Sequence, residues 1–188
     1  MGYNISTTKT ETYKIRWKGE GYGYWADITL DPNETGGRIQ IASDFGNWQS
    51  YWGSTGKCDN SFKRFLCRID IEYTAGKFGC SRYFYKDATL DMWEQQYNED
   101  PFTDQEKHKE FQEEMNVMRE EAPSDNGGFF TFVYSNCPTI ISYFERPDTL
   151  TGIEPRFKSF WKHMWPVFIE QIKQELSAID AKTLEVQP

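Results

Sequence analysis

The sequence predicts an α+β fold: a three- to four-stranded antiparallel sheet with helices packed on one face and an acidic helical arm. Three observations lead to this prediction. Between residues 13 and 43, apolar and polar side chains alternate in segments separated by glycine- and proline-containing turns. Residues 62–69 and 157–176 carry apolar side chains at helical spacing. Residues 87–125 hold thirteen Asp and Glu against three Lys and Arg, a net charge of −10.

The expected strands are residues 13–18, 24–31 and 38–43. Each alternates with period two and is rich in aromatic and β-branched residues, which is typical of a half-buried strand. Pro32 and the glycines at 36–37 supply a hairpin loop between the second and third strand. An antiparallel meander is therefore the expected topology.

Residues 43–53, which we call the aromatic stretch, follow the third strand and hold two tryptophans, a tyrosine and a phenylalanine. Large rings usually serve packing because they bury much apolar area. Rings also stack on nucleotide bases at binding sites. The sequence leaves both interpretations open, so the stretch is either the centre of a core or the wall of a site.

Helices follow in the rest of the chain. An amphipathic helix is expected from residue 61 to Gly76 or Gly79, and a further helix over 84–98. A third helix, with only a narrow apolar stripe, is expected from a capping box at residues 103–106 to residue 121. Residues 129–144 are apolar and fit either a strand or a helix, with a helix favoured. In the last helix, 157–176, Pro166 predicts a kink or a restart.

The expected organisation is one domain in three segments. Residues 1–83 form the antiparallel sheet plus an amphipathic helix, and residues 84–125 form the acidic helical arm. Residues 126–188 form a C-terminal helical segment that completes the same domain.

Arginines interleaved with rings in the first half of the chain form the first candidate site. Guanidinium groups bind phosphates and rings stack on bases, so this pattern suits a nucleotide-type small molecule. The competing interpretation is that the rings form the core and the arginines pair with nearby acids. The candidate ligand-binding residues are Arg16, Arg38, Trp48, Tyr51, Trp52, Arg64 and Arg68.

The acidic helix of residues 103–121 is the second candidate. It is either a solvated face that keeps the protein soluble or a surface that engages a basic groove on a partner. Its many carboxylates, few of them matched by cations, favour a partner. The candidate partner-binding residues are Asp104, Glu106, Glu110, Glu113 and Glu114.

Dedicated chemistry has little support. His108 and His163 are isolated, so no metal site and no cofactor are expected. None of the four cysteines, Cys58, Cys67, Cys80 and Cys137, forms a C-x-x-C pair, and free thiols in a reducing compartment are expected. Basic neighbours such as Arg68 could lower the pKa of Cys67, although a buried structural cysteine is favoured.

A resemblance is carried by Ser43-Asp44-Phe45-Gly46, Trp48 and Tyr51-Trp52-Gly53, and by a second run from Phe62 to Lys77. These residues resemble a family of small proteins encoded by phages and prophages. The resemblance covers about residues 38–79, with a weaker echo over 160–168. It implies an accessory phage protein acting in the cytoplasm of a bacterial host, where many such proteins counter host defence.

The resulting hypothesis is a non-enzymatic phage protein that antagonises a bacterial defence system. It would act by sequestering a nucleotide-type signal or by capturing a host defence protein. The net charge of −8 argues against direct nucleic-acid binding, and no apolar run is long enough for a membrane span. A homo-oligomer is left open. The alternatives are a phage enzyme acting on nucleotides or nucleic acid through Asp44, Asp70 and the arginines, and a structural or regulatory phage protein.

Overall fold

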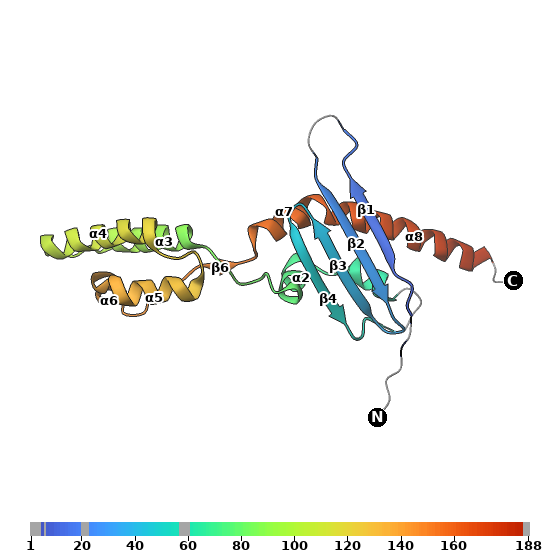
Figure 1. Ribbon diagram of the computed structural model, residues 1–188, viewed down its shortest axis with the longest axis horizontal. Coiled ribbons are helices and arrows are strands. Elements are labelled where there is room, and N and C mark those ends of the chain that lie inside the picture. The colour runs from blue at the N-terminus through green and yellow to red at the C-terminus, as the bar shows by residue number, and fades with distance from the viewer. Residues whose placement is uncertain (1–4, 6, 20–22, 57–60, 186–188) are drawn as a thin grey trace, which may run out of the picture. The chain divides into compact units, whose positions relative to one another are not determined.

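The protein has an α+β fold with one four-stranded antiparallel sheet and, among the described residues, eight helices (Figure 1). The computed structural model describes residues 5, 7–19, 23–56 and 61–185. Each strand pairs with the next along the chain, as the predicted meander requires. The strands are β1 (Glu11–Arg16), β2 (Trp25–Pro32), β3 (Gly37–Ser43) and β4 (Gly46–Trp52).

The fourth strand lies within the aromatic stretch, for which no secondary structure was predicted from the sequence. Trp48 lies opposite Ile41 and Trp52 lies opposite Gly37 in the ladder between β3 and β4. The two tryptophans are 9% and 5% exposed, while Tyr51 between them is 59% exposed. Period two thus places both indoles on the buried face of the sheet.

The turn between β3 and β4 is held by hydrogen bonds from two side chains. The Ser43 hydroxyl accepts from the N–H groups of Phe45 and Gly46, each at 3.3 Å. The Asp44 carboxylate accepts from the N–H of Trp25 at 2.8 Å, so it reaches across to β2. Gly46 has a φ of 151°, which other residues rarely adopt.

Four helices cover one face of this sheet (Figure 1). Their apolar side chains form one core with the inner residues of the strands, including Ile28, Ile41, Phe62 and Phe157. Gly37 permits the close approach of the first helix, because a Cβ atom there would lie 2.6 Å from the Phe62 ring. These helices are α1 (Ser61–Leu66), α2 (Ile71–Phe78), α7 (Pro155–His163) and α8 (Trp165–Glu185).

The helix expected from residue 61 to 79 is two helices. Asp70 caps a new helix, since its carboxylate accepts from the N–H of Tyr73 at 2.8 Å. Gly79 ends that helix in the left-handed region, with a φ of 76°, as the sequence predicted. The restart predicted near Pro166 is confirmed, because α7 ends at His163 and Pro166 lies in the first turn of α8.

The chain divides into two compact units. We call residues 1–81 and 153–188 the sheet unit, and residues 82–152 the helical unit. The helical unit contains α3 (Lys86–Glu99), α4 (Gln105–Glu121), α5 (Asn126–Asn136), α6 (Pro138–Phe144) and the short paired strands β5 (Tyr83–Phe84) and β6 (Thr151–Gly152). No described helix is both long enough and apolar enough to cross a membrane.

The helical unit has a core of its own. Trp93, Tyr97, Phe111 and Phe129 are fully buried there, and the Tyr97 and Phe111 rings stack with their centroids 3.7 Å apart. The Trp93 indole donates to the backbone carbonyl of Asp148 at 2.7 Å. A buried polar edge is thus matched by an acceptor, as a stable core requires.

Residues 129–144 are helical, which confirms the favoured prediction. The segment was ambiguous because α5 is apolar on most sides: Phe129 and Val133 are buried, yet Tyr134 is 59% exposed. Pro138 separates α5 from α6, where it occupies the first helical position. Both helices belong to the compact unit that contains α3 and α4, whereas the sequence predicted them as part of the C-terminal segment.

Candidate functional site

The side chains predicted to form one nucleotide site are separated by the sheet. Trp48 and Trp52 point into the helix-covered core. Arg16, Arg38 and Tyr51 are exposed and occupy the opposite face, which we call the open face. Because successive side chains of a strand point to opposite faces, these two groups cannot line one pocket.

Both tryptophans pack against rings of the core. The Trp48 ring lies 5.1 Å from Phe157 in an edge-on arrangement and 5.3 Å from Phe160. Trp52 lies 5.9 Å from Phe62, and its indole N–H donates to the Tyr73 hydroxyl at 2.9 Å. The geometry favours the packing interpretation of the aromatic stretch.

The arginines of the open face pair with acids on the same face. Arg16 lies 2.6 Å from the Asp27 carboxylate, and its guanidinium sits 5.3 Å from the centre of the Trp25 ring. Arg38 lies 3.1 Å from the Asp31 carboxylate. In each pair the carboxylate neutralises the positive charge that would otherwise bind a phosphate. This arrangement matches the competing interpretation, in which the arginines pair with nearby acids.

The last two arginines of the predicted set lie near α1. Arg64 forms an ion pair at 2.5 Å with Asp180 of α8, so it joins the two helices. Arg68 follows α1 and is exposed. Neither residue is on the open face with Arg16 and Arg38.

The acidic residues predicted to bind a partner also divide into groups. Asp104 is the N-cap of α4, since its carboxylate accepts from the N–H of Glu106 at 2.9 Å and of Lys107 at 3.4 Å. The predicted capping box placed the cap at Thr103, one residue too early. Glu113 is exposed and pairs with Lys109 at 3.4 Å, while Glu106 is exposed.

Glu110, which is exposed, and Glu114, which is half-buried, both bind α6. The two carboxylate oxygens of Glu114 accept from the N–H groups of Thr139 at 3.0 Å and Ile140 at 2.8 Å. The Thr139 hydroxyl donates to Glu110 at 3.3 Å. Because the N-cap residue Cys137 makes no side-chain capping bond, a carboxylate from another helix caps α6.

Replacing Glu114 by alanine should lower the free energy of unfolding by about 1–2 kcal/mol, because two N–H groups of α6 lose their acceptor. Denaturation of the full chain measures this loss, and hydrogen exchange at Ile140 should accelerate. The matched change is Glu113→Ala, which removes an exposed i,i+4 pair and should cost under about 0.5 kcal/mol. Equal losses for the two variants would contradict the capping role.

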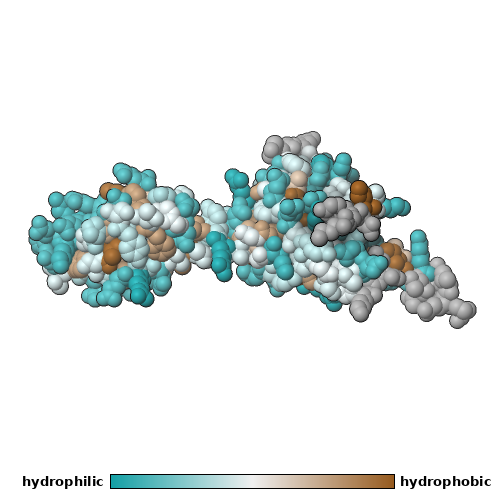
Figure 2. Space-filling view, turned by 60° about the horizontal axis from the view of Figure 1, so that its bottom comes forward, coloured by the Kyte–Doolittle hydropathy of each residue, from teal (hydrophilic) through white to brown (hydrophobic). Residues whose placement is uncertain are grey.

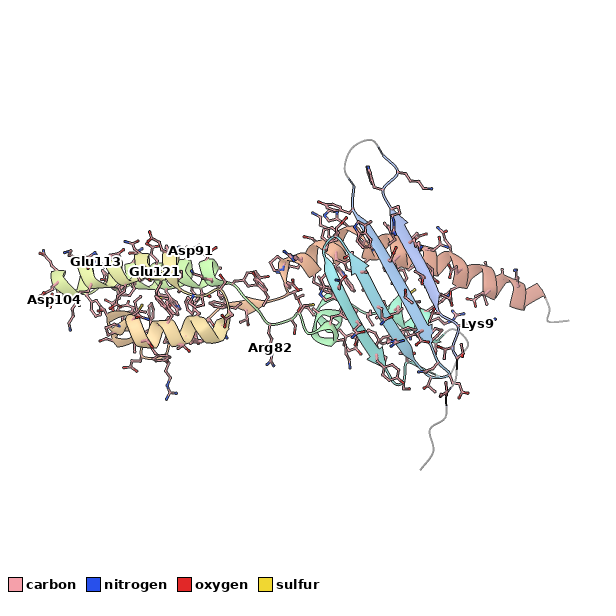
Figure 3. All side chains as sticks on the ribbon, viewed as in Figure 1. Lys9, Arg82, Asp91, Asp104, Glu113 and Glu121 are labelled. Atoms are coloured by element: carbon pink, nitrogen blue, oxygen red, sulfur yellow. The ribbon has the colours of Figure 1, made fainter. Side chains whose placement is uncertain are left out.

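Other carboxylates of α4 remain exposed to solvent. Glu106, Glu120 and Glu121 have no ion pair with any described residue, and Val117 beside them is 40% exposed. Figure 3 shows acidic side chains, among them Glu113 and Glu121, along the length of the layer formed by α3 and α4. We call Glu106, Glu113, Val117, Glu120 and Glu121 the acidic face.

The sequence already contained a signal for this division. Glu114 is three residues after Phe111 and four before Met118, both buried, so it shares the helix side that faces the core. Glu113, Val117, Glu120 and Glu121 share the other side by the same spacing. The predicted partner-binding set did not use this distinction, and it omitted the last two glutamates.

The three cysteines that the structure describes are poor nucleophiles in this fold. Burial raises the pKa of Cys80 and of Cys137 to about 11, so both stay protonated at neutral pH. Burial also raises the pKa of Cys67, and this effect outweighs the lowering by Lys173, Arg64 and Arg68. Cys58 lies outside the described residues.

The carboxylates of the enzyme alternative bind backbone N–H groups. Asp44 accepts from Trp25 and Asp70 caps α2, so each has a role in positioning the chain. Within the described part of the chain, no group of three or more His, Cys, Asp and Glu is placed to hold a metal ion.

A groove of about 1020 Å³ lies between the outer edge of β1 and α8. Its walls are Glu11–Arg16 and Lys18 on one side and residues from Pro166 to Glu175 on the other. The sequence alone did not indicate this groove, because it depends on where α8 crosses the sheet. Both walls belong to the sheet unit.

A charged cluster lies at the part of this groove that Glu11, Tyr13 and Glu175 line. Lys63, whose side chain is 10% exposed, lies 2.6 Å from the Glu11 carboxylate and 2.9 Å from that of Glu175. The Tyr13 hydroxyl donates to Glu175 at 2.9 Å. Burial by itself lowers the pKa of Lys63, but hydrogen bonds with Glu11, Tyr13 and Glu175 raise this pKa by more than burial lowers it. The ammonium group therefore stays charged. This cluster joins β1, α1 and α8.

The comparisons with known proteins agree with the resemblance. A family model described as "Phage family" matches residues 5–178, a longer span than the motifs at residues 38–79. Comparisons with curated proteins and with solved structures found no match. Because the family model covers most of the chain, the protein belongs to this phage protein family.

Proposed function

We propose that this phage protein acts by binding a protein of the infected bacterial cell, and that the acidic face of α4 makes the contact. The supporting observation is where the charge lies. The helical unit holds fifteen Asp and Glu against six Lys and Arg, a net of −9, while the rest of the chain has a net of +1. An acidic surface of this kind is complementary to a basic groove and accelerates association with it.

Two of the carboxylates are placed where they oppose the stability of α4. Glu120 and Glu121 occupy its last turn, and negative charge is unfavourable at a helix C-terminus. The nearby Lys86 ammonium donates to the backbone carbonyls of Arg119 and Ala122, so it binds the end of the helix instead of pairing with these glutamates. Because Glu120 and Glu121 make no stabilising contact with any described residue of the fold, their presence supports a role in binding a partner.

Apolar side chains on the same unit support a protein partner over a small ion. Val117 is 40% exposed among the glutamates of α4, and Tyr134 is 59% exposed on α5. Figure 2, which brings the α5–α6 side of the helical unit forward, shows hydrophobic residues among hydrophilic ones. An apolar side chain surrounded by charged ones, as Val117 is on α4, is typical of a protein interface.

The partner we favour is a host defence protein, as the phage context suggests. Sequestering a nucleotide-type signal has less support, since two of its proposed rings are in the core and Arg16 and Arg38 pair with carboxylates. Antagonism of bacterial defence is thus proposed to proceed by capturing a protein.

Neutralising the acidic face tests this proposal. Full-length Glu120→Gln/Glu121→Gln, used to capture proteins from a lysate of phage-infected bacteria, should recover about tenfold less of a stoichiometric host protein. Its melting temperature should equal or exceed that of the wild type, because the change removes unfavourable charge from the end of α4.

The matched control is Glu34→Gln/Glu72→Gln, which changes the net charge equally at exposed positions of the sheet unit. It should capture the host protein as the wild type does. Raising the salt from about 0.05 M to about 0.5 M should release the partner. Equal capture by both double variants would refute the proposed surface.

A further inference from the structure

The outer edge of β1 has backbone groups available for pairing. β1 is the first strand of the sheet and pairs only with β2 among the described residues. The N–H of Trp25 donates to Asp44 and its carbonyl accepts from the Asp44 N–H, both toward β3. Because strand residues direct their backbone groups to alternate sides, Ala26, Ile28 and Leu30 bond to β1.

The same alternation applies to β1. Its residues opposite Ala26 and Ile28 are Ile15 and Tyr13, whose backbone groups therefore point to β2. The backbone N–H and C=O groups of Thr12, Lys14 and Arg16 consequently point away from β2, into the groove described above. A strand placed there would find donors and acceptors at the correct spacing.

The floor of the groove suits the inner side of such a strand. Val167 of α8 lines it and is 53% exposed, and beside it are the amides of Gln171 and Gln174. The carboxylate of Glu170 also lines the groove and accepts from the Gln174 amide at 3.2 Å. An apolar side chain pointing inward from an added strand would cover Val167. The cluster of Lys63, Glu11, Glu175 and Tyr13 fixes β1 on α8, so the groove is formed before a ligand arrives.

The cations at the edge of β1 favour an added strand with negatively charged side chains. Lys14 and Lys18 line the groove, and neither has an ion pair with any described residue. Arg16 adds a third cation, although it pairs with Asp27. A second copy of β1 added antiparallel to this edge would bring its own Lys14 and Arg16 close to Lys14 and Arg16 of the first copy. Like charges on neighbouring strands repel, so this pairing is unfavourable. Carboxylates directly opposite would be favourable for the same reason.

We propose that the groove between β1 and α8 binds an extended acidic segment of a partner protein, which adds as a fifth, antiparallel strand. Acidic side chains of that segment face Lys14 and Lys18, and apolar side chains alternate with them and pack on Val167. The backbone supplies affinity and the alternation supplies specificity. This site is separate from the acidic face of α4, because its two walls belong to the sheet unit.

The probe is a capped peptide of about nine residues in which glutamate and valine alternate, titrated into the full-length protein. We expect saturable binding below about 1 mM, and binding weakened about tenfold by Lys14→Glu/Lys18→Glu. That variant should instead bind the matching lysine–valine peptide. The variant Glu120→Gln/Glu121→Gln should bind the acidic peptide as the wild type does, so the two proposals can fail separately.

Two N-methylated versions of the acidic peptide test the strand pairing. In antiparallel addition, the residues opposite Lys14 and Thr12 direct their N–H groups to β1, and these are the glutamates. N-methylation of the glutamates should abolish binding, whereas N-methylation of the valines should leave it unchanged. Equal binding of the two peptides would refute strand addition. A dimer of the protein that the peptide dissociates would assign the edge to a second copy and also overturn the proposal.

Discussion

Replacing Trp48 by alanine is expected to lower the free energy of unfolding by about 3–5 kcal/mol. The Trp48 ring is 9% exposed and contacts Phe157 and Phe160 across the core of the sheet unit. Removing it leaves a cavity between β4 and α7 that the surrounding rings cannot fill without shifting. Urea denaturation of the full chain, followed by circular dichroism, measures the loss.

The control for this prediction is the neighbouring ring on the other face. Tyr51 is 59% exposed, and its hydroxyl accepts one hydrogen bond from the Asn33 amide at 3.2 Å. Tyr51→Ala should therefore change the stability by only about 0.5 kcal/mol. If Trp48→Ala were as stable as the wild type, the packing role of the aromatic stretch would be refuted and the binding-site interpretation would be favoured.

Replacing Lys63 by methionine is expected to lower the free energy of unfolding by about 3 kcal/mol. The change keeps most of the volume but leaves the carboxylates of Glu11 and Glu175 facing each other without the cation between them. Two like charges at a partly buried site repel and cannot be fully hydrated. The triple variant that adds Glu11→Gln and Glu175→Gln should recover most of the loss, and no recovery would contradict the charge explanation.

The same cluster makes stability depend on pH in the acid range. Burial alone would raise the pKa of Glu175, but hydrogen bonds from Gln171, Lys63 and Tyr13 lower it. A carboxyl group whose pKa is lower in the folded state contributes stability at higher pH and loses it as the pH falls through the folded pKa. Stability should therefore decline below the ordinary pKa of glutamate, about 4.3, and less steeply in Glu175→Gln.

The strands and most helices could be predicted because their signals are local. Alternation at residues 13–43 and the apolar spacing of residues 157–176 each reflect contacts made by one element with one core. The strand at Gly46–Trp52 also alternates, but its concentration of rings left a binding site open as an alternative to packing. α5 was harder, since a helix that is apolar on most sides has no periodicity to detect.

The candidate site was less predictable because it depends on contacts between distant residues. Glu114 caps a helix that begins 24 positions later in the sequence, at Pro138, and only its place beside Phe111 and Met118 indicated an inward direction. Arg16 and Trp48 were predicted to belong to one binding site, yet the sheet directs their side chains to opposite faces. The groove beside β1 exists only once α8 crosses the sheet.

Native mass spectrometry of the protein purified from phage-infected bacteria tests the proposed function most directly. The account predicts a complex with one host protein in fixed stoichiometry, retained by Glu34→Gln/Glu72→Gln and lost in Glu120→Gln/Glu121→Gln. A mass increase equal to a nucleotide, with no bound protein, would contradict capture through the acidic face and restore the small-molecule hypothesis.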